Sequence, residues 1–234
     1  MSFKLIPALA ASIFLMTGFA TSDTTAKEAV PEKGDPNFLV ARNAYSDQLY
    51  LNPDASPGAR AFREVFIAPL NLSKLQVIQP EGVSSDQEWE ITDIEDGILQ
   101  NAMVNEFSAA LSFESAYNMV DRRADADMII HTTAVAIHPY ANKAEVAAGA
   151  KSGGAITISL ALINAETGKV MVRTVDTKST DNIWAFNEVD NEEEAVNLIF
   201  RAWGNSMRRG LLHLQGRSSD PLMGTLQLKE QTGK

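Results

Sequence analysis

Three histidines, His131, His138 and His213, are the first residues to consider for metal binding or acid–base chemistry. No two of them are four residues apart, which is the spacing that lets two side chains of one helix share a metal ion. His131 and His138 are seven residues apart, so one unbroken strand would place them on opposite faces. A nucleophile elbow would need a Gly-x-Ser-x-Gly sequence, and the chain has none. We therefore predict no catalytic residue and no metal ligand, and expect structural or surface histidines.

The segment around Lys151-Ser152 is the chain's nearest approach to a phosphate-binding loop. Such a loop needs a Gly directly before the Lys and another Gly five residues earlier. Ala150 and Glu145 occupy these positions instead, so we expect an ordinary mobile loop and no bound cofactor.

Acidic side chains are abundant, with 30 Asp and Glu residues in the chain, and their clusters have ordinary structural explanations. Asp125 and Asp127 precede a predicted strand, while Asp93 and Glu95 open a predicted helix. A calcium loop needs a central Gly, which the acidic run 190–194 lacks. These carboxylates therefore predict no metal site.

Aromatic residues in predicted loops are the candidates for a contact surface. Trp89 lies in the first long loop, and Trp184 and Phe186 follow a predicted hairpin. Trp and Tyr contribute much of the binding energy at protein interfaces, but loop aromatics also cover sheet edges and fill cores. Both alternatives stay open at the level of the sequence.

A series of strands and helices must position these residues. A capping box of Thr92 and Glu95 begins a helix that ends near residue 112. Alternating apolar residues in 156–162 and 170–177, joined by a turn that contains Gly168, predict a β-hairpin. Acidic residues begin a second helix at 190–194, and Gly216 ends it. The remaining predicted strands are 62–70, 117–120 and 128–137.

The connections complete the predicted architecture. Residues 37–60 are expected to form an irregular arm, 71–91 a long connection and 139–153 a mobile loop. Apolar residues recur at helical spacing in both helices, beginning at Ile94 in the first, so each helix should bury one face. The order of elements predicts an α+β, two-layer sandwich with a mixed or antiparallel sheet of about four to five strands and two amphipathic helices on one face.

The N-terminus has the pattern of a secretory signal peptide, with Lys4, an apolar run, and small residues before a predicted cleavage after Ala20. We divide the chain into a signal peptide (1–20), a flexible leader (21–36), a single α+β domain (37–216) and a polar disordered tail (217–234). Phe19 stands where a lipoprotein signal carries its lipidated Cys, and the chain contains no Cys. We therefore do not expect lipid anchoring.

The composition argues against several classes of partner. The 234 residues carry a formal net charge of −10, so phosphates of nucleic acids and anionic lipid head groups would be repelled. No apolar run in the mature chain reaches the roughly 18 residues that span a bilayer. The absence of Cys excludes disulfides and zinc thiolates.

Several motifs together resemble a bacterial family of small envelope lipoproteins that is catalogued as domain of unknown function 3313. They are the strand 62–69 that ends in Pro69, the turn with Thr167-Gly168, the pair Val175-Asp176, and a closing helix with Ala202-Trp203. The resemblance covers residues 37–215. It implies an exported protein of Gram-negative bacteria with no assigned activity and no catalytic residue to carry over.

These observations lead to three hypotheses about function. The first is a non-enzymatic exported envelope module, periplasmic or associated with the outer membrane through a partner, that binds another envelope protein by a sheet edge and loop aromatics. The alternative is a carrier for a small ligand, lipid or glycan, in a cleft between sheet and helices. The third is an uncharacterised hydrolase, which would depend on His131 or His138.

Overall fold

The computed structural model describes residues 38–41, 46–54, 61–181, 183 and 193–217, all within one compact unit, Pro31–Lys234. The strands are β1 (Leu39–Ala41), β2 (Gln48–Leu51), β3 (Glu64–Ile67), β4 (Gln76–Val77), β5 (Asn118–Met119), β6 (Met128–Pro139), β7 (Gly154–Asn164) and β8 (Val170–Thr180). The helices are α1 (Asp93–Ser112), α2 (Lys143–Ala147) and α3 (Glu193–Leu214).

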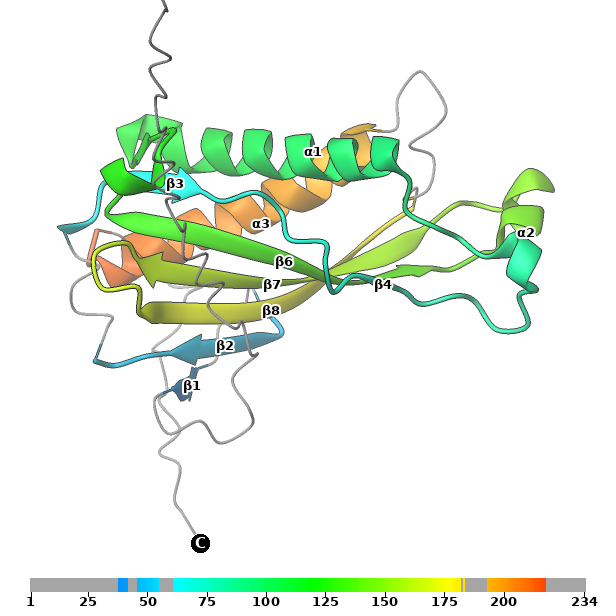
Figure 1. Ribbon diagram of the computed structural model, residues 1–234, viewed down its shortest axis with the longest axis horizontal. Coiled ribbons are helices and arrows are strands. Elements are labelled where there is room, and N and C mark those ends of the chain that lie inside the picture. The colour runs from blue at the N-terminus through cyan, green and yellow to red at the C-terminus, as the bar shows by residue number, and fades with distance from the viewer. Residues whose placement is uncertain (1–37, 42–45, 55–60, 182, 184–192, 218–234) are drawn as a thin grey trace, which may run out of the picture. The chain divides into compact units, whose positions relative to one another are not determined.

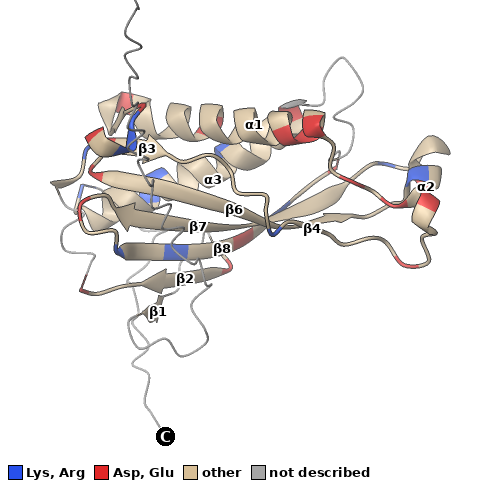
Figure 2. Ribbon diagram, viewed as in Figure 1, with Lys and Arg blue, Asp and Glu red and all other residues tan. Residues whose placement is uncertain are grey.

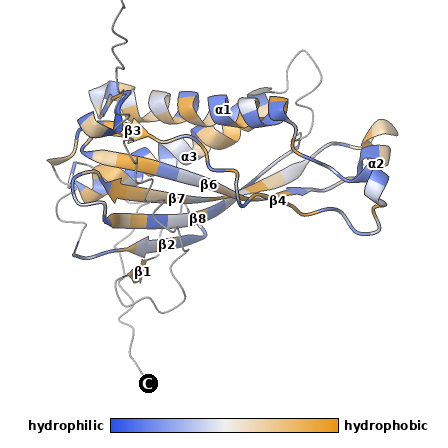
Figure 3. Ribbon diagram, in the orientation of Figure 1, coloured by the Kyte–Doolittle hydropathy of each residue, from blue (hydrophilic) through white to orange (hydrophobic). Residues whose placement is uncertain are grey.

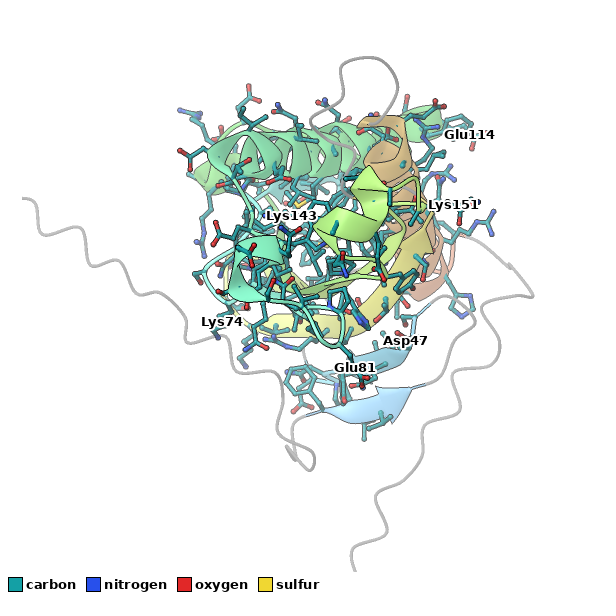
Figure 4. All side chains as sticks on the ribbon, turned by 90° about the vertical axis from the view of Figure 1, so that its right-hand side faces the viewer. Asp47, Lys74, Glu81, Glu114, Lys143 and Lys151 are labelled. Carbon is teal, nitrogen blue, oxygen red and sulfur yellow. The ribbon has the colours of Figure 1, made fainter. Side chains whose placement is uncertain are left out.

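The fold has two layers, one sheet and the helices α1 and α3 on one of its faces (Figure 1). The sheet order is β1-β2-β8-β7-β6-β3-β5, and β4 also pairs with β6. Pairing is antiparallel from β1 to β6 and parallel where β3 joins β5 and β6. The predicted α+β class is confirmed, although the described sheet has 8 strands instead of four or five. Seen from the end, the sheet curves beneath the two helices (Figure 4).

Helix α1 begins as the capping box predicts. The Thr92 hydroxyl accepts from the backbone N of Glu95, and the Glu95 carboxylate accepts from the backbone N of Thr92. The predicted apolar stripe is buried from Leu99 to Leu111, but Ile94 is 66% exposed, so its inclusion in the stripe was wrong. Ile94 lies in the first turn, ahead of the part of α1 that covers the sheet.

Helix α3 crosses close to α1 at Gly204. A Cβ built on Gly204 would lie 3.0 Å from the Cβ of Ala110 and 3.1 Å from the carbonyl oxygen of Glu106. This position therefore needs a residue without a side chain. The helix ends as predicted, because Gly216 adopts a φ of +67° just after it.

The core lies between the helices and the helix-facing side of the sheet. Phe107 of α1 and Phe200 of α3 pack edge to face at 6.0 Å, and Phe200 and Trp203 do so at 5.3 Å. Figure 3 shows the hydrophobic residues that run along β6 and β7 beneath this layer. Every second residue of β7 from Ile156 to Leu162 is buried against the helices.

Three segments that were predicted as irregular contain regular structure. Within 37–60, β1 and β2 extend the sheet from β8, and within 71–91, β4 adds to β6. Within 139–153, Asn142 and Glu145 form a second capping box that begins α2. Strands β2 and β4 are short and take their backbone partners from distant parts of the chain, so local patterns did not reveal them. Helix α2 was missed although its capping box is a local pattern that the sequence shows.

A β-bulge in β6 overturns the prediction that His131 and His138 lie on opposite faces. The register with β7 shifts between Ala134 and Ala136, so one extra residue is inserted in β6. His131 then lies opposite Ala161 and His138 opposite Ala155. Ala155 and Ala161 are six residues apart on β7, and an even spacing places both on the same face of the sheet. They alternate with the helix-facing residues of β7, so both histidines lie on the sheet face away from the helices. They are about 20 Å apart along the strand.

Candidate functional site

A pocket lies between the helix-facing side of the sheet and the second half of α3, and we call it the α3 pocket. Its volume is about 80 Å³. Strands β2, β7 and β8 form its floor, and Trp203, Met207 and Leu211 line it from α3. Its polar lining residues are Ser46, Thr174, Asp176, Ser206 and His213. Apart from these the walls are apolar, which makes the pocket suited to a nonpolar group.

Asp176 is the one buried carboxylate of the α3 pocket and is 6% exposed. Its Oδ2 accepts a hydrogen bond from Trp203 Nε1 at 2.7 Å and pairs with Lys178 Nζ at 3.0 Å. Its Oδ1 accepts from the backbone N of Asp47 at 3.0 Å. Both oxygens are therefore engaged, and the carboxylate ties β8 to α3 and to the residue before β2. A buried carboxylate held in this way is a structural anchor and has no oxygen left to act as a general base.

The other polar groups of the α3 pocket do not complete a catalytic arrangement. His213 follows Trp203 by ten residues on α3, about 15 Å along the helix axis, so it cannot share a proton with Asp176. The Nδ1 of His213 is buried, with no hydrogen-bond partner among the described residues. The Ser206 hydroxyl donates to the carbonyl oxygen of Ala202 at 2.8 Å, in the same helix. The geometry offers a nonpolar binding pocket with polar residues at its margins.

The size of the α3 pocket limits its occupant. A dry cavity of about 150 Å³ binds benzene, so about 80 Å³ has room for one small aliphatic group. Pockets for drug-sized ligands run from about 300 to 1,000 Å³. The α3 pocket therefore suits a single aliphatic side chain better than a whole lipid chain or sugar.

The sheet ends close to this pocket. Leu49 and Leu51 of β2 line it, and β1 follows β2 as the last strand of the described sheet. The three residues of β1 are Leu39, Val40 and Ala41, none of them charged, and Val40 is 40% exposed. Charged side chains protect many sheet edges against pairing with another chain, and the three residues of β1 carry none.

Trp89 lies in a different place, beside the start of α1. Its Nε1 donates to the carbonyl oxygen of Ala141 at 2.8 Å, and its backbone N and O bond to the side chain of Gln79 at 2.9 and 2.7 Å. The ammonium group of Lys143 lies 5.7 Å from the ring centroid. Trp89 is half-buried and fastens the 71–91 connection to the segment that carries α2. Its role as a contact residue stays a prediction, and Trp184 and Phe186 lie outside the described residues.

The remaining candidates are not brought together either. Lys151 pairs with Asp181 at 3.1 Å, and both side chains are more than four-fifths exposed. Within the described ranges, no group of three or more His, Asp or Glu side chains is placed to hold a metal ion. The part of the chain that the structure describes contains no helix with the length and apolarity to cross a membrane.

Sequence reasoning did not identify the α3 pocket. One signal was present in β8, where Thr174, Asp176 and Lys178 alternate on one face of a strand. The register places these residues opposite Leu160, Ile158 and Ile156 of the helix-facing side. Polar residues on the buried face of a hairpin indicate a site that needs buried hydrogen bonds.

Comparisons with known proteins do not identify a family. No family model matches the chain, and no curated protein matches it. Among solved structures it is similar to the PelC dodecamer from Paraburkholderia phytofirmans, at 8% identity over 61% of this chain and 86% of that one, with a TM-score of 0.37. Lipoprotein GNA1162 from Neisseria meningitidis matches at 10% identity over 63% and 99%, with a TM-score of 0.34.

A third solved structure, the hypothetical protein CT253 from Chlamydia trachomatis, matches at 8% identity over 67% of this chain and 99% of that one, with a TM-score of 0.38. Similarities at these identities and TM-scores assign neither a family nor a function. Membership of domain of unknown function 3313 therefore stays a prediction.

Proposed function

We propose that this chain is an exported, non-enzymatic module of the bacterial envelope that binds another envelope protein. The observation that carries the proposal is the α3 pocket, which is apolar and admits one aliphatic side chain. Interfaces draw much of their energy from a few side chains that enter such pockets. The signal-peptide pattern of residues 1–20 supports export.

The uncharged edge of β1 supplies a second contact for the same partner. A strand added to β1 would gain backbone hydrogen bonds, and the pocket formed by β2 and α3 would select an aliphatic side chain. The two contacts lie on neighbouring strands, so one partner segment can use both.

The carrier hypothesis receives less support from the same pocket. A lipid or glycan carrier needs a cavity several times larger than about 80 Å³. For the hydrolase hypothesis, the described residues of the α3 pocket place no free base beside a nucleophile, since both oxygens of Asp176 are engaged and His213 is remote from it. The dependence of that hypothesis on His131 or His138 stays a prediction.

A site-specific crosslink tests the proposal in intact cells. Ala202 is exposed on α3 and lies one turn before Ser206 at the pocket margin, so a photoreactive amino acid there would reach a bound partner. Ala109 is an exposed alanine of α1 and serves as the matched control. We expect one discrete covalent adduct from position 202 and none from position 109. No adduct at 202, or the same adducts at both positions, would contradict the proposal.

A further inference from the structure

The sheet face away from the helices carries an uncharged patch at the end where β4 and α2 lie. Neither β6 nor β7 contains a charged residue (Figure 2). The register brings six residues to this part of the face: Ile78, His138, Tyr140, Thr157, Thr177 and Ser179. We call them the open sheet patch. In a chain with a net charge of −10, an uncharged surface of this kind requires an explanation.

Tyr140 is the centre of the open sheet patch. It follows β6, and its hydroxyl lies 3.0 Å from the hydroxyl of Ser179 on β8. Since β7 lies between β6 and β8, the side chain must extend across β7. Beneath the Tyr140 side chain lie Gly153, directly before β7, and Ala155 of β7, and both are buried. Because neither has a side chain larger than a methyl group, the tyrosine ring can lie close to the strand. The ring is fixed at both ends and remains 56% exposed.

Polar side chains surround this ring. His138 packs edge to face against Tyr140, with ring centroids 5.8 Å apart at 81°. The hydroxyls of Thr157 and Thr177 lie 3.0 Å apart across β7 and β8, one residue pair further along the sheet. Hydroxyl groups donate and accept hydrogen bonds, so the row can bind hydroxyl groups of a ligand.

We propose that the open sheet patch binds a neutral glycan chain. A sugar ring presents C–H groups to an aromatic face and hydroxyls at its edges, which matches a fixed tyrosine beside a row of hydroxyls. At the margin, Lys151 and Asp181 form an ion pair at 3.1 Å, and the Asp47 carboxylate accepts from the backbone N of Thr177 at 3.0 Å. An anionic ligand would need a positive charge on the patch, and none of its six residues is Lys or Arg. A protein interface would need an apolar centre, whereas Ile78 is the patch's single large aliphatic side chain.

Titration of the full mature chain with neutral hexasaccharides tests the proposal. The probes are the β-1,4-linked hexamers of N-acetylglucosamine and of glucose, with a hexamer of galacturonate as the charged comparison, followed by NMR of the backbone amides. We expect a neutral hexamer to shift the amides of β6–β8 at this end of the sheet. Tyr140→Ala should weaken its binding by about tenfold, which corresponds to about 1.4 kcal/mol, because the variant loses the aromatic face on which a sugar ring would stack.

Two further variants control the experiment. Phe113→Ala removes another aromatic residue that is 58% exposed, and it should leave glycan binding unchanged. Tyr140→Phe keeps the ring but removes the bond to Ser179, so it should weaken binding less than Tyr140→Ala does.

Several results would overturn the proposal. The first is that neither neutral hexamer binds. The second is that Tyr140→Ala binds a neutral hexamer as tightly as the unmodified chain does. The third is that the galacturonate hexamer binds as tightly as the neutral hexamers do. Loss of a protein partner in Tyr140→Ala without any glycan binding would make the patch a protein contact instead. The open sheet patch and the α3 pocket lie on opposite faces of the sheet, so failure of one proposal leaves the other standing.

Discussion

The hydroxyl of Thr132 is a buried polar group without a partner among the described residues, and its removal should stabilise the protein. Thr132 is 0% exposed and lies opposite Leu160 on the helix-facing side of β6. A buried hydroxyl that makes no hydrogen bond costs about 1–3 kcal/mol, because the unfolded chain exposes it to water. Valine has a similar shape without the hydroxyl, so Thr132→Val should raise the free energy of unfolding by about 1–2 kcal/mol.

Urea denaturation followed by circular dichroism measures this change directly, and the melting temperature should rise by about 2–8 °C. The matched control is Thr157→Val, which removes a hydroxyl that lies 3.0 Å from the Thr177 hydroxyl on the other face of the sheet. Thr157→Val should lower the free energy of unfolding by about 0.5–1 kcal/mol. A fall in stability for Thr132→Val would refute the reasoning, because it would mean that this hydroxyl has a partner inside the core.

Three further predictions follow from the packing. Gly204→Ala should lower the free energy of unfolding by about 1–2 kcal/mol, since the new methyl group would lie 3.0 Å from the Cβ of Ala110. Its control is Gly97→Ala, where the added Cβ would have no atom within 4 Å, and this variant should raise the free energy of unfolding by about 0.5–1 kcal/mol in the same urea assay. Burial raises the pKa of Tyr117 to about 12, above the value near 10 of the unfolded chain. The folded state therefore holds the phenol proton of Tyr117 more tightly than the unfolded state does. This difference contributes about 2–3 kcal/mol to the free energy of unfolding below pH 10, and the contribution is lost as the pH rises towards 12. Melting curves over that range should show this loss, and Tyr117→Phe should lack it. Ser206→Leu should fill part of the α3 pocket and raise the free energy of unfolding by about 1 kcal/mol, because the added side chain buries apolar surface against the pocket walls. A loss of stability in Ser206→Leu would mean that the pocket has no room for the added side chain.

The sequence predicted the elements whose determinants are local. The capping box of Thr92 and Glu95 marked the start of α1 because each partner lies within one turn of the other. The hairpin of β7 and β8 followed from its alternation and from Gly168, which adopts a φ of +68° in the turn. Gly216 marked the end of α3 for the same conformational reason.

Features that depend on distant partners were not predictable from these patterns. Strand β2 is held by β8, which follows it by more than 100 residues, and β1 pairs in turn with β2. The bulge near Ala134 in β6 exists only as a mismatch of register with β7, so the sequence separation of His131 and His138 gave the wrong face.

The α3 pocket was missed for a similar reason. It forms where β2, β8 and α3 meet, and the position of Asp176 beside Trp203 depends on how that helix packs. The indole and carboxylate are 27 residues apart and form one hydrogen bond only in the folded chain. The predicted contact residues Trp89, Trp184 and Phe186 came from loop position alone, which carries no information about the pocket.

The most direct test of the central claim is to repeat the crosslink from position 202 in two variants of matched chemistry. Ser206→Leu fills the α3 pocket, and Ser112→Leu changes a serine of α1 whose hydroxyl makes the same bond to the carbonyl four residues earlier, at 2.7 Å. Both variants should remain folded by circular dichroism. We predict that the adduct with the envelope partner disappears in Ser206→Leu and persists in Ser112→Leu. An adduct of equal yield in both variants would contradict the claim that the pocket receives the partner.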